Sequence, residues 1–275
     1  VELLRAEQVD TLLHLAWRER LWRREEDFDS NVLGAMQLLG ACVDAGVRQV
    51  VWRSTTAVYG ASAENALYMP ESTPLAARSA YAYVRDALEV ERFIAGFAVD
   101  YPDTRFAVLR FANVIGLDAD TPLTRLLRQP LWPDLLGFDP LLQVIDADDA
   151  IAALAHAALH PLHGPINLAA PGIVSLCQLA GRLGRPALPI LHWLVYWGWP
   201  LVGSLPGGRD LLAWFPLEPD YLRYPWIADT ARMQAEPGLA PQWNATEAVQ
   251  RYIEGLRMRR YQRPAGDQPY AADQL

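Results

Sequence analysis

The chain has 275 residues, of which 52% are hydrophobic and 20% are charged, and its formal net charge is −8 with a pI near 5.1. This length suffices for one large α/β domain, or for a domain with a small lobe. The acidic balance excludes a nucleic-acid-binding protein, because the chain has no basic stripe that could neutralise phosphates.

The two cysteines and the first residues bear on the cellular location. Cys42 and Cys177 lie in apolar helical patterns and predict buried free thiols, which suits a reducing cytoplasm. The charged start at residues 1–7 does not have the pattern of a signal peptide. Because the chain begins with Val1 and its first element has the pattern of mid-domain structure, we expect an N-terminally truncated sequence.

The first half of the chain alternates between apolar runs and helical spacing, which is typical of βαβ units and a parallel sheet. The predicted strands cover residues 9–16, 48–53 and 106–110. The predicted helices cover residues 29–45 and 79–98. Asp29 or Ser30 is the expected N-cap of the first helix, and Gly46 is its expected C-cap.

From Leu117 onward prolines cluster and this rhythm breaks, which predicts a smaller lobe covering a cleft. Its predicted strands cover residues 142–145 and 166–169, and its predicted helices cover 148–159 and 175–183, capped by Asp148-Asp149 and by Ser175. We therefore divide the chain into a partial cofactor domain at 1–116, to which 142–159 return, a substrate lobe at 117–262, and a disordered tail at 263–275.

Hydroxyl side chains follow the predicted strand at 48–53, in Ser54-Thr55-Thr56. In an open α/β sheet, ligands bind at the carboxyl ends of the strands. Further along, Tyr81 and Tyr83 stand at the start of the next predicted helix. A Ser/Thr hydroxyl facing a tyrosine is how a nicotinamide enzyme moves a proton and a hydride on a sugar or alcohol carbon.

Four segments follow one another in an order that identifies a resemblance. They are Asp10…His14-Leu15-Ala16, Asn31-Val32-Leu33-Gly34, Ser54-Thr55-Thr56-Ala57-Val58-Tyr59-Gly60, and Arg110-Phe111-Ala112-Asn113-Val114-Ile115-Gly116. With them, residues 5–260 resemble the extended short-chain dehydrogenase/reductases, the group of NAD-dependent sugar-nucleotide epimerases and dehydratases such as UDP-glucose 4-epimerase. The chain is most similar to the epimerase-related proteins common in actinobacteria, whose catalytic lysine is often not kept.

The resemblance implies a fold and a reaction. The fold is an α/β, Rossmann-type, doubly wound parallel sheet, here lacking its first strands, with a small C-terminal α/β substrate lobe. The cofactor is NAD, with NADP left open, and the substrate is a small molecule of the nucleotide-sugar type. In this family a tyrosine exchanges a proton with a sugar hydroxyl while NAD takes the hydride.

The resemblance also assigns residues to roles. The catalytic candidates are Thr55, Tyr83, Tyr81 and Arg85. The cofactor-binding candidates are His14, Leu15, Ala16, Asn31, Ser54 and Tyr83. The substrate-binding candidates are Thr56, Asn113 and Gln143.

The helix with the tyrosines departs from the family pattern, because no lysine stands four residues after either tyrosine. If Tyr83 is the acid/base, which the acidic stretch at 88–91 favours, the lysine position is Ala87. If Tyr81 is the acid/base, that position is Arg85, and arginine does not simply replace lysine. A third interpretation makes both tyrosines packing residues.

Two further departures concern ligand binding. The sequence has no Gly-x-x-Gly-x-x-Gly phosphate loop, which we attribute to the expected loss of two βα units. Leu142 stands where the family often has an arginine for the diphosphate, so a standard UDP-sugar is in doubt. These departures support an alternative function, a catalytically degenerate NAD- or nucleotide-sugar-binding scaffold protein.

The remaining patterns concern metals, partners and the surface. The histidines at 156, 160 and 163 lack accompanying carboxylates or cysteines, so we expect no metal site. The stretch 18–24, which has mixed charges, is expected to be solvated surface. The aromatic segment 188–202 is open to three interpretations: a core or lid helix, a helix resting on a membrane, or a dimer patch. Family members often dimerise through two helices, here those at 29–45 and 79–98, so we expect a homodimer.

Overall fold

The computed structural model describes residues 1–19, 25–78, 81–208, 212 and 216–262. The tail at 263–275 and residues 79–80, the expected start of the second helix, lie outside the described residues. Both cysteines are free: Cys42 is buried, as expected, and Cys177 is only half-buried.

Four parallel strands form the main sheet, in the order β1-β2-β3-β8. They are β1 (Thr11–His14), β2 (Gln49–Thr55), β3 (Arg105–Phe111) and β8 (Gly164–Leu168). Most side chains of the two central strands are buried. Parallel sheets are usually covered on both faces, so both sides of each strand are apolar, which explains the continuous apolar runs in the sequence.

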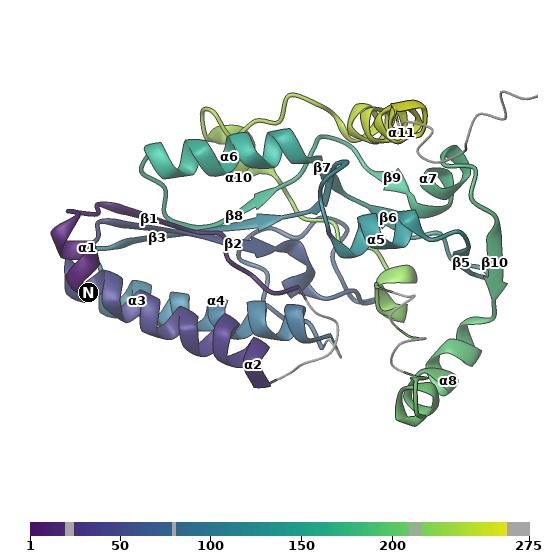
Figure 1. Ribbon diagram of the computed structural model, residues 1–275, viewed down its shortest axis with the longest axis horizontal. Coiled ribbons are helices and arrows are strands. Elements are labelled where there is room, and N and C mark those ends of the chain that lie inside the picture. The colour runs from purple at the N-terminus through teal and green to yellow at the C-terminus, as the bar shows by residue number, and fades with distance from the viewer. Residues whose placement is uncertain (20–24, 79–80, 209–211, 213–215, 263–275) are drawn as a thin grey trace, which may run out of the picture.

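Helices cover both faces of this sheet (Figure 1). On one face lie α3 (Gly34–Ala45) and α4 (Ala82–Asp100), packed on alternate residues of β2 and β3 such as Val50 and Phe106. On the other face lie α6 (Ala147–Leu159) and α10 (Ala231–Ala235), packed on the intervening residues such as Val51 and Ala107. The α/β fold with a Rossmann-type parallel sheet is thus confirmed.

The first long helix begins earlier than the sequence indicated. A short helix, α1 (Glu2–Ala6), precedes β1; after it, α2 (Glu25–Phe28) runs into a π-helical turn at Asp29–Leu33 and then into α3. The expected N-cap at Asp29 or Ser30 is therefore wrong: both residues lie inside the helix, because the residues before them are also helical. The expected C-cap is confirmed, since Gly46 has the left-handed φ of 77°.

The rest of the chain builds three small two-stranded sheets and their helices. The elements are β4 (Asn113–Ile115), α5 (Pro122–Arg128), β5 (Trp132–Leu135), β6 (Leu141–Leu142), β7 (Val144–Asp146), β9 (Val174–Ser175), α7 (Leu176–Arg182), β10 (Ala187–Ile190), α8 (His192–Ser204), the 3₁₀ helix η3 (Pro219–Leu222) and α11 (Ala245–Gln262). Figure 1 shows α8 standing at one end of the molecule, beyond the β5–β10 pair.

Of the two helix N-caps predicted in this part of the chain, one is confirmed and one is wrong. Ser175 caps α7 as expected, accepting a hydrogen bond from the Gln178 amide at 3.2 Å. The expected cap at Asp148-Asp149 is wrong, because Asp146 caps α6 and accepts from the Asp148 amide at 2.9 Å. Asp149 instead accepts from two backbone amides ahead of α11, so its carboxylate ties that segment to α6.

Candidate functional site

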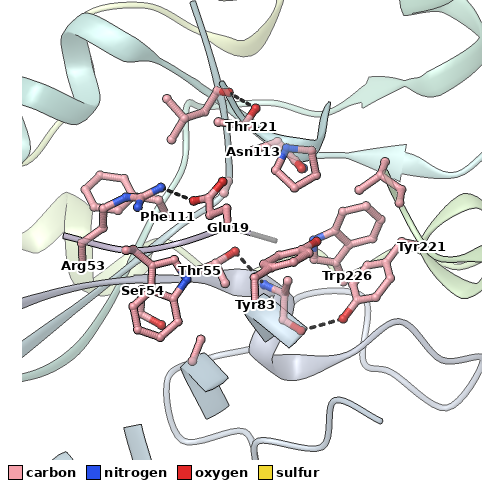
Figure 2. Close-up of a pocket in the computed structure, with 17 residues that line it drawn as sticks. Glu19, Arg53, Ser54, Thr55, Tyr83, Phe111, Asn113, Thr121, Tyr221 and Trp226 are labelled. Carbon is pink, nitrogen blue, oxygen red and sulfur yellow. Dashed lines mark hydrogen bonds and ion pairs between the residues drawn. The ribbon is translucent and has the colours of Figure 1, made fainter. Parts of the chain in front are cut away.

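A pocket opens at the carboxyl ends of β2 and β3, the edge where ligands bind in open α/β sheets (Figure 2). Its residues come from the segment after β1, the ends of β2 and β3, the start of α4, and distant segments of the second half. They are Trp17, Glu19, Arg53, Ser54, Thr55, Ala57, Tyr83, Ala87, Phe111, Ala112, Asn113, Val114, Thr121, Pro122, Leu217, Tyr221 and Trp226.

Thr55 and Tyr83 meet at this pocket. Thr55 ends β2, and its Oγ1 accepts the Ala57 amide at 3.2 Å, which caps the 3₁₀ helix η2 (Thr56–Tyr59). Tyr83 reaches the pocket from the first turn of α4. Tyr81, one residue ahead of α4, is fully buried and does not line the pocket, and its amide donates to Glu218 at 2.7 Å. Of the two candidate tyrosines, Tyr83 is the one that lines the same pocket as Thr55.

The Tyr83 phenol lies in surroundings that oppose ionisation. Burial raises its pKa well above the usual value of 10, and the carboxylates of Glu19 and Glu218 raise it further. The Arg125 guanidinium acts in the opposite direction but does not offset burial. Tyr83 is therefore protonated at neutral pH in the unliganded pocket.

The position one turn after Tyr83 is inside the pocket and carries no charge. Ala87 is 5% exposed and lines the pocket. Arg85, the other candidate, has an exposed side chain and is not among the lining residues. The sequence contains no lysine, so no other residue of these 275 can supply the ammonium group.

A carboxylate occupies the pocket where the sequence predicted solvated surface. Glu19 lines the pocket and pairs through Oε1 with Arg53 Nη2 at 2.5 Å. Its backbone oxygen accepts from Arg125 at 3.0 Å. Its Oε2 is buried and has no hydrogen-bond partner among the described residues. Sequence reasoning missed Glu19 because the mixed charges around it look like an ordinary surface.

The cofactor candidates at the end of β1, His14, Leu15 and Ala16, do not line the pocket. The His14 ring stacks on Trp52 with 3.7 Å between centroids, and burial lowers its pKa to about 4. Leu15 and Ala16 follow with exposed side chains. Asn31 is buried in the π-helical turn, and its side-chain amide binds the backbone of Arg18. It accepts from the Arg18 N–H at 3.1 Å and donates to the Arg18 carbonyl at 3.2 Å. Asn31 therefore positions the segment that carries Trp17 and Glu19.

Ser54 lines the pocket, but its hydroxyl is already engaged. It donates a short hydrogen bond to Glu91 of α4. Glu91 pairs with Arg110 of β3 at 2.7 Å, and both side chains are almost fully buried. Arg110 also donates to the Tyr59 hydroxyl at 2.8 Å. Thr55, rather than Ser54, is thus the hydroxyl positioned to meet a ligand.

The substrate candidates separate into one that lines the pocket and two that do not. Asn113 lines the pocket and donates from Nδ2 to the Gln143 carbonyl at 2.9 Å. Thr56 is buried inside η2 and lies outside the pocket. Gln143 also lies outside it, since its side-chain amide binds both backbone groups of Ala228, at 2.8 and 2.9 Å.

Two aromatic rings on the far side of the pocket come from the second half of the chain. Trp226 meets Tyr221 edge-on with 4.8 Å between centroids. The Tyr221 hydroxyl donates to the Ala57 carbonyl at 2.8 Å, which connects η3 to the segment that follows Thr55. No local sequence pattern predicts these rings, because only the fold brings residues this far apart in the chain to one place.

Metal ligands are not gathered at this site. Within the described residues, no group of three or more His, Cys, Asp and Glu could hold a metal ion. His156 and His160 stack on each other with 4.0 Å between ring centroids at the end of α6.

Comparisons with known proteins agree with this architecture. Residues 1–169 match the model of the "NAD dependent epimerase/dehydratase family". An uncharacterized protein of Mycobacterium tuberculosis is 34% identical over 258 residues, which cover 92% of this chain and 68% of the relative. A UDP-glucose 4-epimerase of Azospirillum brasilense is 29% identical over 160 residues, 53% of this chain and 43% of that protein.

A solved structure shows the same fold. The UDP-glucose 4-epimerase of Thermotoga maritima, determined with UDP-glucose, superposes with a TM-score of 0.68 at 18% identity, covering 94% of this chain and 80% of that one. The family match spans more than half of the chain, and the sheet, the pocket and the order of the motifs agree with it. The chain belongs to the NAD-dependent epimerase/dehydratase family.

Proposed function

We propose that this protein is an NAD-dependent oxidoreductase of the epimerase/dehydratase type that acts on a sugar hydroxyl or keto group of a nucleotide sugar. The observation that carries the proposal is the meeting of Thr55 and Tyr83 in one pocket at the carboxyl edge of the sheet. The pocket draws on both the predicted cofactor domain and the predicted substrate lobe, as a cleft between the two would. Membership of the family supports NAD as the cofactor.

The residues of the pocket suit the reactive end of such a cofactor. The buried Oε2 of Glu19, which lacks a hydrogen-bond partner among the described residues, can accept from a ribose hydroxyl or an amide. Thr55 offers a hydroxyl in the same pocket. The sequence contains no glycine-rich phosphate loop, so these residues form only the catalytic half of an NAD site. Bound NADH would supply the hydride that reduces a carbonyl carbon, and bound NAD⁺ would accept a hydride in the reverse direction.

The protonation of Tyr83 gives the proposed reaction a direction. A general acid must carry its proton at working pH, and burial together with Glu19 keeps the Tyr83 phenol protonated. We propose that Tyr83 donates its proton to a substrate oxygen while Thr55 orients that oxygen by a hydrogen bond. This arrangement favours reduction of a keto group over oxidation of a hydroxyl.

A pair of tyrosine variants tests the proposal. Tyr83→Phe removes only the hydroxyl in the pocket, and Tyr81→Phe removes an equally buried hydroxyl outside it. With a keto nucleotide sugar and NADH, we expect Tyr83→Phe to abolish NADH consumption and to leave NADH affinity nearly unchanged, whereas Tyr81→Phe remains active. Turnover that is unchanged in Tyr83→Phe would remove Tyr83 from the mechanism.

A second candidate function is binding without catalysis. Two observations favour it: Ala87 fills the lysine position, and Leu142, where the family often has an arginine, is fully buried in the core. A binding protein would show a calorimetric signal with UDP-glucose or NAD but no change in NADH absorbance when both are present. Any NADH formed or consumed with a nucleotide sugar would contradict it.

We also propose a homodimer that uses the outer faces of α3 and α4. These helices lie side by side on one face of the sheet (Figure 1). The face includes the exposed Leu33 and the helical Gly40, above which there is open space. Light scattering of the whole chain measures the oligomer directly; a dimer that persists after Leu33→Arg would place the interface elsewhere.

A further inference from the structure

The end of the molecule formed by β10 and α8 exposes large apolar side chains to solvent. Six of them define what we call the apolar tip: Leu188, Leu191, Trp193, Leu194, Trp197 and Leu201. Trp197 is 82% exposed and Leu201 65%. Soluble proteins rarely present so many large apolar groups together unless the surface meets a partner.

The exposed side chains of α8 share one side of the helix. At 100° per residue, Trp193, Leu194, Trp197 and Leu201 all fall within about a 100° sector. The opposite side holds the helix to the body: the Tyr196 hydroxyl donates a short hydrogen bond to Asp220, and Val195 packs on the core. The apolar side of α8 therefore projects outward while its other side is fixed.

The chemistry of the segment favours lipid over protein as the partner. No Asp, Glu, Lys or Arg occurs between 186 and 208, in a chain that is otherwise 20% charged. Protein interfaces need about one hydrogen bond per 100–200 Å² and usually have a polar rim. The six side chains of the apolar tip offer only the indole N–H groups of two tryptophans, whereas tryptophan is enriched at the interfaces of membranes.

Arginines without acidic neighbours in the sequence precede the uncharged stretch, which suits the phosphates of a lipid surface. Arg182 and Arg185 precede it, the first exposed and the second half-exposed, and Arg209-Asp210 follow it in the sequence. A segment that enters the headgroup region keeps its cations at the level of the phosphates. No Asp or Glu occurs from 150 to 209, so the charge next to the tip on its N-terminal side is positive and complementary to anionic phospholipid.

The segment is suited to lying on a bilayer rather than crossing it. The 13 residues of α8 extend about 20 Å, less than the roughly 30 Å of hydrocarbon in a bilayer. Across the described part of the chain, no helix is long and apolar enough to span a membrane. We propose that the apolar tip docks this protein onto a phospholipid surface, with α8 lying in the headgroup region. This inference does not depend on the proposed catalytic function.

Docking would also set the orientation of the pocket. Asp220, which accepts from Tyr196 of α8, lies in η3 next to Tyr221, whose ring lines the pocket. Arg223, immediately after η3, lies 5.7 Å from the centre of the Tyr196 ring. The docking helix and one wall of the pocket are therefore joined through the same few residues.

Co-sedimentation of the whole chain with vesicles of phosphatidylcholine and phosphatidylglycerol tests the proposal. The variant Trp197→Ser/Leu201→Ser removes two apolar groups of the tip, and Val99→Ser/Leu159→Ser removes two equally exposed ones elsewhere. We expect the unmodified chain and the control pair to sediment with vesicles. The tip variant should bind about a hundredfold more weakly, since each buried apolar side chain is worth about tenfold or more.

Three results would overturn the proposal. The first is an unmodified chain that stays in the supernatant at high lipid, and the second is an equal loss of binding in the control pair. The third is a dimer, seen by light scattering, that Trp197→Ser/Leu201→Ser converts to a monomer, because a second copy would then cover the tip. Circular dichroism checks the fold of each variant, and Trp193→Ser/Leu194→Ser provides a second tip variant if the first does not fold.

Discussion

Restoring a lysine at position 87 should change the ionisation of Tyr83. Ala87 stands one turn after Tyr83 on α4 and lines the same pocket. Residues four apart on a helix have Cβ atoms about 5–6 Å apart. For unit charges at this separation and an effective dielectric constant of about 20, the interaction is about 3 kcal/mol, or about two pKa units. Ala87→Lys should therefore lower the pKa of the Tyr83 phenol by about two units.

The absence of lysine from this chain makes the experiment unusually clean. Reductive methylation with ¹³C-formaldehyde would label only the new lysine and the terminal amine, so the lysine titration can be followed by NMR. The Tyr83 titration is the ultraviolet difference between Ala87→Lys and the same variant with Tyr83→Phe. Ala87→Met controls for side-chain volume, and Arg85→Lys places a lysine on the exposed side of the helix.

A Tyr83 titration that the new lysine leaves unchanged would refute the expected coupling of the two positions. If Ala87→Lys folds and the Tyr83 titration is the same as in Ala87→Met, the two positions are not electrostatically coupled and Tyr83 is not in the family's catalytic register. Glu19→Gln supplies an independent test of the same electrostatics, because removing a carboxylate that raises the pKa of Tyr83 should lower that pKa as well. An unchanged titration in this variant would show that burial alone sets the value.

Three further predictions concern stability. Arg110→Met leaves the Glu91 carboxylate buried without its charged partner and should cost about 3–5 kcal/mol in urea unfolding, most of it recovered in Arg110→Met/Glu91→Leu. A single variant that unfolds at the same urea concentration as the unmodified chain would contradict this. His14 has a folded-state pKa of about 4 against 6.5 in model compounds, so the free energy of unfolding should fall as pH is lowered between these values. His14→Phe should flatten that part of the pH profile, and an unaltered profile would assign it to other groups. Gly46→Ala should lower the free energy of unfolding by about 1 kcal/mol, because Gly46 has a left-handed φ. Gly40→Ala, inside α3, should raise it by a similar amount. Thermal unfolding measures both, and equal effects of the two variants would refute the assignment to backbone conformation.

The strands and long helices were predictable because their residues are buried on a regular period. The alternation of Val50 and Val51 toward opposite faces of the sheet, for instance, is a local property of the strand. The helix caps were less predictable. Aspartate is a good N-cap but also lies readily in a first helical turn, and only the contacts of Asp149 with the segment ahead of α11 reveal its use.

The candidate site was predictable only on the side that follows the strands. Thr55, Tyr83 and Asn113 stand at the ends of elements that a sequence pattern can locate, and all three line the pocket. Glu19 and Tyr221 come from segments without a regular pattern, so their positions depend on the folding of the whole chain. For the same reason, no sequence pattern predicts that the Ser54 hydroxyl donates its hydrogen bond to Glu91.

Gln143 has a consequence for how the second half of the chain can evolve. Its side-chain amide is chemically a peptide group, and it binds the N–H and C=O of Ala228 as a neighbouring strand would. A glutamate at this position would place an acceptor against the Ala228 carbonyl, and a leucine would leave both backbone groups unsatisfied. Met69 pairs with the other side of the same backbone, through hydrogen bonds to Ile227 and Asp229, so Ala228 is held between a strand-like neighbour and the Gln143 amide. The loop that carries Trp226 can therefore change its side chains as long as its backbone keeps these contacts.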